Sequence, residues 1–415
     1  MFRKFAIQDL HPGMYIFDSS GTALDNPFMY STEGLVKNIE EIQNIVSQGF
    51  KEVVVDLDRS YKEWDVLYGV PSEQALVALL EKKSSPSSLL QPQQSPLEPQ
   101  VELKDELPKA TALYDDAIQT AQRVMQDFKK NGELDVEAGS VVVKDIVGSI
   151  LRNMNALQAI SKLRTQDDYT FSHCVNVSML AAMFTRHLGY NDDAVFEAGM
   201  GGFFHDLGKA RMPAKILTAA RRLTPEEFAT MHRHPSLGYE FLTKVPEVSE
   251  AVRLVALEHH ERIYGTGYPY GKRGEQLSIQ GKIVSIVDVY DALSSRRTYK
   301  TAMLPHRALG LLYGLRESEL DEDLTEQFIR CMGIYPAGSI VMLSTGEVAV
   351  VTQVNHNTLL RPKVLIVRDA HTTLAKPHEC DLAAAEDISI VASLKHGAFG
   401  IHPGRILKKH ISASK

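Results

Sequence analysis

The sequence predicts a mainly α-helical protein, with a small α+β module at its N-terminal end and a small β domain at its C-terminal end. Three observations predict this class. Apolar residues recur at helical spacing through 109–333, short apolar runs between turn residues fill 337–391, and a segment rich in Ser, Pro and Gln precedes the helices. We therefore expect four parts, at residues 1–64, 65–108, 109–335 and 336–415.

The first part combines strands with a helix. Residues 5–18, FAIQDLHPGMYIFD, predict two short strands around a Pro-Gly turn. Residues 31–50, STEGLVKNIEEIQNIVSQGF, place apolar residues at helical spacing after a Ser/Thr start with a glutamate capping signal. The run EVVVDLD at 52–58 predicts a buried strand, so this part makes a small α+β module.

The second part predicts a linker. Residues 83–108 read KSSPSSLLQPQQSPLEPQVELKDELP, in which Ser, Pro and Gln dominate. Such a composition buries too little apolar surface to offset the entropy of ordering the chain. We expect a flexible connection between the N-terminal module and the helical part.

The third part is helical and the fourth is built from strands. The clearest helical spacings lie in 111–130, 144–163, 171–190 and 280–295. Beyond residue 335, GSIVMLSTGEVAVVTQVN and LLRPKVLIVRDA alternate or run apolar between turn residues. These segments predict a small β domain, for which a barrel is one arrangement.

Charge, hydropathy and cysteine spacing argue against a nucleic-acid-binding, membrane-spanning or disulfide-rich secreted protein. The net charge of −7 argues against a general role at nucleic acids or membrane surfaces. The N-terminal segment turns polar too soon for a signal peptide, and no apolar run approaches the roughly 18 residues of a membrane span. Cys174, Cys331 and Cys380 are too far apart for a disulfide framework, which suits a reducing cytosol. We expect a cytoplasmic protein that binds no DNA.

Histidines concentrate in the helical part, where seven of the fifteen fall between His173 and His260. His173 shares one helix face with apolar residues at +4, +7, +11 and +15, and His259 also lies on the apolar face of its helix. Asp288 lies in KIVSIVDVYDALSS, a segment too apolar to face only water. These inward polar groups need partners, because burying them unpaired is costly.

Two interpretations fit these inward histidines and this inward aspartate. A single inward histidine is usually a hydrogen-bonded core residue, and a single inward aspartate usually caps a helix or pairs with arginine. Several such groups in one region would need many separate partners, whereas one shared metal site satisfies them together. Imidazole and carboxylate without thiolate suit iron, manganese, nickel or zinc.

Four motifs occur in the order typical of one family. They are HDLGK at 205–209, His234 in MHRHPSLG, HHERIYGTGYP at 259–269 and DVYDALSSRRTYK at 288–300. Over residues 140–333 the chain resembles the HD-GYP family, a branch of the HD-domain metal-dependent phosphohydrolases. Its first 60 residues, through LHPGMY, resemble the small N-terminal module of one subclass. The resemblance implies an HD-type helical bundle core that hydrolyses the bacterial second messenger cyclic di-GMP.

The resemblance also implies a dinuclear metal site. It places Asp206 as the bridge between two divalent ions, with iron favoured and manganese, nickel or zinc as alternatives. The other ligands divide into two sets, which are His173, His205 and Asp288 on one side, and His234, His259 and His260 on the other.

The implied reaction is an in-line attack on phosphorus. Two cations about 3.5–4 Å apart lower the pKa of a shared water, and the resulting hydroxide attacks. Lys209 is expected to donate to the charge developing on the phosphate, unless it is simply a solvated lysine. Arg297 and Lys300 resemble family contacts to phosphate or guanine, with a helix-end charge cluster as the alternative. Tyr268 either contacts substrate or only stiffens its loop. The expected product is linear pGpG, which a second cut would convert to GMP.

Two positions depart from the family pattern. Tyr169 stands where some members carry a glutamate that helps hold a third metal, so we predict two metals. Tyr264 replaces the usual aspartate of the loop, and we expect this to affect loop order more than metal binding. His187 and His232 are interpreted as surface residues.

Two alternatives remain open at this point. One is a catalytically weak sensor that binds cyclic di-GMP or a partner protein, and the other is a phosphohydrolase acting on another nucleotide. We expect the two terminal parts to serve regulation, packing or oligomerisation, with partner signalling proteins or a second copy of the chain.

Overall fold

The computed structural model describes residues 2–6, 14–16, 34–36, 52–56, 71–82, 99–163, 169–217, 223–295, 302–316, 318–371 and 373–407. The chain divides into two compact units, residues 1–72 and 73–415. Within the described ranges, no helix combines the length and the apolar character that crossing a membrane requires.

The N-terminal unit contains a small antiparallel sheet with strand order β1-β4-β2-β3. Val53 and Val55 are fully buried, as the apolar run at 52–58 predicts. The described strands are β1 (Phe2–Ala6), β2 (Tyr15–Ile16), β3 (Gly34–Leu35) and β4 (Glu52–Asp56).

The helix expected at 31–50 does not begin at its Ser/Thr start. Gly34 and Leu35 form β3 instead, where they pair with Tyr15 and Ile16 of β2. Pairing with a neighbouring strand overrides the local helical spacing at these two residues. Residues 37–50 lie outside the described part of the chain.

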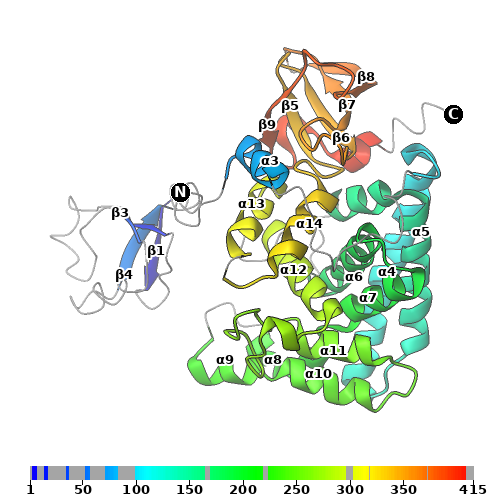
Figure 1. Ribbon diagram of the computed structural model, residues 1–415, viewed down its shortest axis with the longest axis vertical. Coiled ribbons are helices and arrows are strands. Elements are labelled where there is room, and N and C mark those ends of the chain that lie inside the picture. Colours follow the sequence, from blue (N-terminus) through cyan, green and yellow to red (C-terminus); the bar gives the residue numbers. More distant parts are fainter. Residues whose placement is uncertain are drawn as a thin grey trace. The chain divides into compact units, whose positions relative to one another are not determined.

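The second unit is built mainly from helices (Figure 1). Its longer helices are α3 (Glu73–Lys82), α4 (Leu103–Asn131), α5 (Val136–Leu163), α6 (Tyr169–His187), α7 (Asp192–Phe204), α10 (His234–Thr243), α11 (Glu250–Glu258), α12 (Ile279–Ser294), α13 (Pro305–Leu315) and α14 (Glu322–Met332). The shorter ones are α8 (Ala214–Leu217), α9 (Pro225–Met231) and the 3₁₀ segments η2 (Leu207–Arg211), η3 (Gly274–Gln276) and η4 (Ala398–Gly400).

Helix α6 lies at the centre of this bundle and packs against α4, α5, α7 and α12. Phe184 on α6 is fully buried and meets Phe328 of α14 edge-to-face, with ring centroids 5.2 Å apart. Burying one such side chain contributes roughly 1.5–3 kcal/mol to stability. The mainly helical class and the four strongest helical segments are confirmed.

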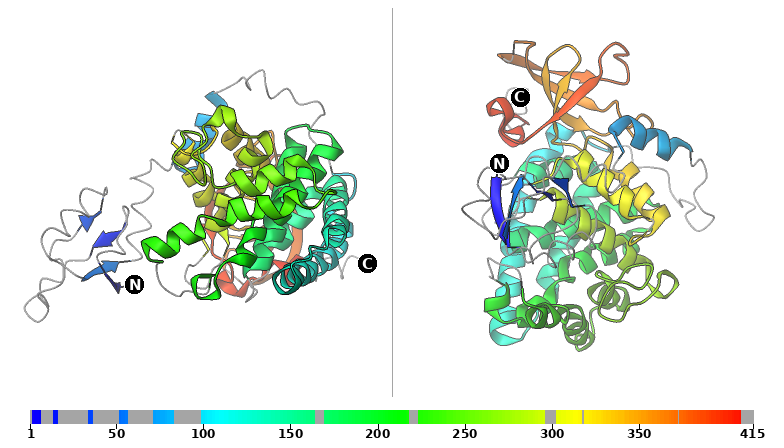
Figure 2. Two further views of the ribbon diagram at one scale, coloured as in Figure 1. Left: turned by 90° about the horizontal axis from the view of Figure 1, so that it is seen from below. Right: turned by 90° about the vertical axis from the view of Figure 1, so that its left-hand side faces the viewer.

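The C-terminal part is a five-stranded antiparallel sheet with order β8-β7-β6-β5-β9. It lies at one end of the helical bundle, and α8–α10 lie at the other end (Figures 1 and 2). Asn155 of α5 ties the sheet to the bundle by accepting a hydrogen bond from the Val354 amide at 3.2 Å. The strands are β5 (Ile340–Leu343), β6 (Val348–Gln353), β7 (Lys363–Arg368), β8 (Leu374–Asp381) and β9 (Ile390–Leu394).

Part of the segment expected to be a linker is helical. Helix α3 lies within 65–108, and Leu76 and Leu80 bury one of its faces in the core. Helix α4 begins at Leu103 and buries Leu107. The Ser/Pro/Gln-rich residues 83–98 lie outside the described part of the chain. The four domain boundaries stay a prediction.

Candidate metal centre

The predicted ligands come from helices that pack against one another. Most lie at a helix end, where a side chain can turn toward a point beyond its own helix. Six are buried and His260 is half-buried. They are His173 in α6, His205 and Asp206 directly after α7, His234 at the start of α10, His259 and His260 directly after α11, and Asp288 in α12.

Two glycines let these elements approach closely. A Cβ on Gly202 of α7 would lie 2.8 Å from the backbone nitrogen of Ser178 in α6. A Cβ on Gly208 of η2 would lie 2.0 Å from the carbonyl oxygen of His234. Any larger residue would push these segments apart. Gly202 therefore draws α7 toward the helix of His173, and Gly208 holds the segment after Asp206 against the start of α10.

The outer ring nitrogens fix the orientation of three histidines. The Nδ1 atoms of His205, His234 and His259 lie 2.7, 2.8 and 3.0 Å from the carbonyl oxygen three residues earlier. A carbonyl oxygen only accepts, so each Nδ1 carries a hydrogen and donates it. In the neutral ring Nε2 then keeps a lone pair, which is the orientation usual for metal-bound histidine.

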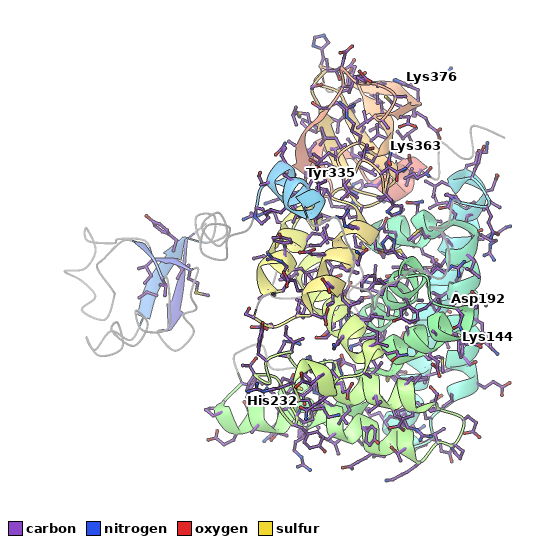
Figure 3. All side chains as sticks on the ribbon, viewed as in Figure 1. Lys144, Asp192, His232, Tyr335, Lys363 and Lys376 are labelled. Carbon is purple, nitrogen blue, oxygen red and sulfur yellow. The ribbon has the colours of Figure 1, made fainter. Side chains whose placement is uncertain are left out.

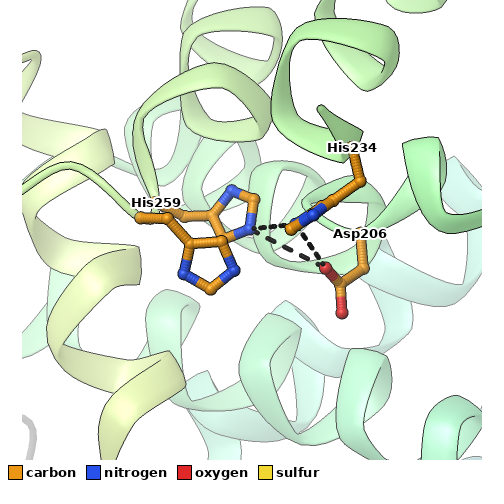
Figure 4. A group of neighbouring side chains, drawn as sticks. Asp206, His234 and His259 are labelled. Atoms are coloured by element: carbon orange, nitrogen blue, oxygen red, sulfur yellow. Dashed lines mark hydrogen bonds and ion pairs between the residues drawn. The ribbon is translucent and has the colours of Figure 1, made fainter. Parts of the chain in front are cut away.

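These inner nitrogens converge on Asp206, and Figure 4 shows this for His234 and His259. Asp206 Oδ1 lies 3.4 Å from His234 Nε2 and 3.7 Å from His259 Nε2. The other oxygen, Oδ2, lies 3.3 Å from His205 Nε2 and 3.9 Å from His173 Nε2. Each oxygen of one carboxylate thus faces a different pair of rings.

Several of these atoms are poorly matched to one another without a cation. The Nε2 atoms of His234 and His259 face each other at 3.3 Å, although both Nδ1 atoms already carry the hydrogen. His205 Nε2 and Asp206 Oδ1 are buried and make no hydrogen bond among the described residues. Buried polar atoms in this state are costly, and a cation between them would satisfy them together.

The atoms form two groups that share Asp206. The ligand atoms within each group lie within 4.8 Å of one another. One group consists of Asp206, His234, His259 and His260, and the other of His173, His205 and Asp206. A donor set of imidazoles and carboxylate fits divalent transition metals.

Asp288 belongs to neither group but touches both. Its Oδ1 lies 3.2 Å from His173 Nε2, and its Oδ2 lies 3.8 Å from His260 Nδ1. The structure therefore gathers all of the predicted ligand residues in one cluster. Their individual roles stay predictions.

Comparison with known proteins identifies the family. Three family models match: an HD domain at 142–324, a KOW domain associated with HD domain at 340–399, and a domain of unknown function (DUF3391) at 2–138. A Pseudomonas aeruginosa protein, cyclic di-GMP phosphodiesterase PA4108, is 31% identical over 380 residues, which cover 91% of this chain and 88% of that protein. The chain belongs to the HD-GYP family.

Other relatives match over a shorter stretch. The cyclic di-GMP phosphodiesterase response regulator RpfG of Xanthomonas campestris is 33% identical over 191 residues, which cover 44% of this chain and 50% of that protein. Among solved structures, Bd1817, an HDG"Y"P protein from Bdellovibrio bacteriovorus, aligns with a TM-score of 0.46 and 17% identity, over 79% of this chain and 98% of that chain. The family predicted from the motifs is confirmed, and the HD-GYP name is used below.

The lysine of the HD-GYP motif HDLGK lies against the shared carboxylate. Lys209 Nζ donates to Asp206 Oδ2 at 2.6 Å. Burial disfavours the charged lysine, but the Asp206 carboxylate outweighs it and raises the pKa of Lys209. Lys209 is therefore an ammonium group held beside the metal-binding atoms.

The GYP loop is held by a glutamate whose role the motif alone did not reveal. The buried carboxylate of Glu261 accepts the backbone N–H of Tyr270 at 2.8 Å and that of Lys272 at 3.0 Å. The Tyr268 amide donates to the His260 carbonyl at 3.2 Å. Tyr268 is consequently fixed beside His260, with ring centroids 4.7 Å apart.

Two further residues near the site were missed or misjudged from the sequence. The buried carboxylate of Asp291 lies 2.8 Å from His173 Nδ1, and the i+3 spacing from Asp288 on one helix was the available signal. His187 and His232 were interpreted as surface residues, which is wrong, because both are half-buried. His232, which lies at the end of α9 (Figure 3), stacks on Tyr268 with ring centroids 3.6 Å apart.

The remaining residues singled out from the sequence are the two departures from the HD-GYP pattern and the two predicted substrate contacts. Tyr169 is the first residue of α6, but its side chain lies outside the described part of the structure. Tyr264 is 57% exposed. Arg297 and Lys300 lie outside the described residues. The two-metal count and both substrate contacts stay predictions.

We expect metal binding at pH 7 to release about one proton per chain. Burial disfavours the charged ring of His173, but Asp288 and Asp291 together outweigh it and raise its pKa to about 9. Burial lowers the pKa of His260 to about 3, and burial with neighbouring histidines holds that of His259 well below its ordinary value. His173 is therefore the ring that must lose a proton to bind. Calorimetry in buffers of different ionisation enthalpy counts the protons released.

The pH dependence follows from the same shift. The raised pKa of His173 stabilises the metal-free fold below its ordinary value of 6.5, and this contribution is lost as the pH rises through about 9. Metal affinity should accordingly increase with pH up to that point and then level off. Metal binding at pH 7 without proton release would contradict this assignment.

Proposed function

We propose that this chain is a metal-dependent cyclic di-GMP phosphodiesterase, which opens a 3′–5′ phosphodiester to give linear pGpG. The observation that carries the proposal is the pair of histidine groups that share Asp206, with their Nδ1 atoms committed to donating outward. Relatives named for this activity, PA4108 and RpfG, support cyclic di-GMP as the substrate.

The proposed centre holds two divalent metals, with iron as the first choice and manganese, nickel or zinc as alternatives. Asp206 would be shared by the two ions, because each of its oxygens faces a different pair of histidine rings. When bound, the metals lower the pKa of water and neutralise phosphate charge. The ligands are His173, His205 and Asp288 for one ion, and His234, His259 and His260 for the other.

Lys209 is proposed to stabilise the charge that develops on the phosphate. Its ammonium group occupies Asp206 Oδ2 in the metal-free chain. With metal bound, the attraction between Asp206 and Lys209 would weaken, and Lys209 would donate to a phosphate oxygen instead. A fixed donor in a buried site stabilises developing charge more than water does.

The remaining substrate contacts are proposed from the family motifs. Arg297 and Lys300 bind phosphate or a guanine edge, for which a guanidinium fork is well suited. Tyr268 contacts substrate beside His260. Burial raises the pKa of Tyr268, so its phenol stays a neutral donor.

The proposal is tested by following cyclic di-GMP turnover. The purified chain is stripped of metal, loaded anaerobically with Fe(II) or with Mn(II), and its products are separated by chromatography. We expect pGpG to appear only in the loaded samples, and prolonged incubation shows whether GMP follows. Bound metal without turnover under either condition would contradict the proposal.

The same experiment separates the alternatives. A panel that includes mononucleotides tests the other-nucleotide hydrolase, which a wide preference for a mononucleotide would support. Tight cyclic di-GMP binding that persists for hours without product would support the sensor. The two departures from the family pattern, Tyr169 and Tyr264, are the reason to consider it.

A further inference from the structure

A series of aromatic rings leads from the protein surface to the metal centre. The ring centroids of Phe228 and His232 lie 4.1 Å apart. The rings of His232 and Tyr268 stack at 3.6 Å with an interplanar angle of 10°. Tyr268 in turn lies against His260, one of the predicted metal ligands. We call Phe228, His232 and Tyr268 the aromatic ladder.

The inner end of the aromatic ladder is rigid. Tyr268 is held through its own amide by the His260 carbonyl, and the following turn is held by the carboxylate of Glu261. Near-parallel stacking on Tyr268 then fixes the plane of His232. A ligand that touches this ladder would find its rings already in position.

Phe228, at the outer end of the ladder, is exposed to solvent, and core packing does not explain its position. Phe228 is 53% exposed, and helix α9 buries none of its residues. This helix is stabilised locally instead. The Thr224 hydroxyl accepts the Glu227 amide at 3.3 Å, and the Glu227 carboxylate accepts the Thr224 amide at 3.0 Å. Phe228 is therefore not needed to anchor α9 in the core.

The position of the ladder matches the chemistry of a cyclic dinucleotide. Each phosphodiester in such a ligand has a base one ribose away. A surface that binds this base must therefore lie within the length of one nucleoside of the centre that holds the phosphate. Aromatic side chains beside a phosphate site are a common way to hold a nucleobase, because every base presents a π face.

We propose that Phe228, backed by His232, stacks on one guanine of cyclic di-GMP while the adjacent phosphodiester lies at the metal centre. This inference rests on the proposed function and adds a base-binding subsite to it. Stacking of this kind is present in the bound substrate and in the transition state alike. Its removal weakens binding and leaves the chemical step unchanged.

Kinetics of ring variants test the subsite. We expect Phe228→Leu to raise KM for cyclic di-GMP about tenfold, with kcat within about twofold of the wild type. Phe228→Tyr keeps the ring and should keep the KM. Phe399→Leu removes another exposed phenylalanine, in the C-terminal β domain, and is the matched control. Inhibition by inorganic phosphate, which has no base, should be equal in all four proteins.

A fluorescence measurement detects the stack directly. The chain contains one tryptophan, Trp64, so Phe228→Trp in a Trp64→Phe background places a single indole on the ladder. Rapid mixing with cyclic di-GMP should quench its emission before turnover, and inorganic phosphate should not.

The outcomes separate this inference from the proposed function. If the wild type hydrolyses cyclic di-GMP but Phe228→Leu keeps its KM, the base subsite is wrong and the phosphodiesterase stands. If no protein turns over cyclic di-GMP, the function is wrong, and the quenching result alone decides the subsite. An indole that cyclic di-GMP leaves unquenched would overturn the stacking proposal in either case.

Discussion

Replacing Asp206 with asparagine should lower kcat/KM for cyclic di-GMP by at least about a thousandfold and remove most bound metal. One carboxylate faces both histidine groups, with Oδ1 3.4 Å from His234 and Oδ2 3.3 Å from His205. An amide of the same shape offers only one oxygen and no negative charge. Metal activation is worth several kcal/mol of transition-state stabilisation, and each 1.36 kcal/mol is a factor of ten in rate.

The matched control is Asp127→Asn, which makes the same chemical change at an exposed position of α4. It should leave metal content and rate unchanged. Circular dichroism and the unfolding temperature of Asp206→Asn report whether its fold survives. A folded Asp206→Asn protein that keeps two metals and near-normal turnover would contradict the role of Asp206 as the bridge.

Replacing Asp291 with asparagine should weaken metal affinity about 10–100-fold, although Asp291 is not a predicted ligand. Its Oδ2 lies 2.8 Å from His173 Nδ1, and its Oδ1 accepts hydrogen bonds from Asn176 and Ser295 at 2.9 and 2.7 Å. An asparagine amide must turn its NH₂ toward one of these donors. If it faces His173, the ring must move its hydrogen to Nε2, the atom that binds metal.

Two readouts test this positioning role. Metal affinity is measured by competition with a chelator, and turnover is measured again at saturating metal, where much of the lost activity should return. Ser295→Ala removes a different hydrogen bond from the same carboxylate and should change metal affinity little. Equal metal affinity in Asp291→Asn and the wild type would show that His173 does not depend on this contact.

That the predicted ligand residues gather in one place was predictable, because they lie in compact motifs and within or at the ends of apolar segments. His205 and Asp206 follow an apolar stretch, and His259 and His260 end another. The family motifs and the apolar spacing therefore both predicted that these side chains turn inward. The partners of these residues were harder to predict. The outward hydrogen bonds of His205 and His259 end on backbone carbonyls. Every residue has a carbonyl group, so the sequence does not show which one accepts the bond.

His232 shows a second limit of the sequence. His232 lies two positions before His234, on the turn after α9. Its large apolar neighbour at helical spacing is Phe228, which is itself exposed, so the spacing does not mark His232 as packed in the core. Its partner Tyr268 is 36 residues later and arrives only because the GYP loop folds back over the site. Long-range ring contacts of this kind depend on tertiary packing, which spacing along one chain does not encode.

The β-strand register at the N-terminal end illustrates the same limit. The segment at 31–50 has clear helical spacing, yet Leu35 pairs with Tyr15 across the sheet. Backbone hydrogen bonding between distant segments decided the structure of those residues. The C-terminal β domain was easier, because the apolar runs of β5 and β6 lie between turn residues and are visible locally.

The most direct test of the central claim is anomalous diffraction at the metal absorption edge from crystals of the loaded protein. The account predicts two peaks, both in contact with Asp206, one beside His173 and His205 and the other beside His234, His259 and His260. A single peak, or peaks that do not contact Asp206, would contradict the shared dinuclear centre.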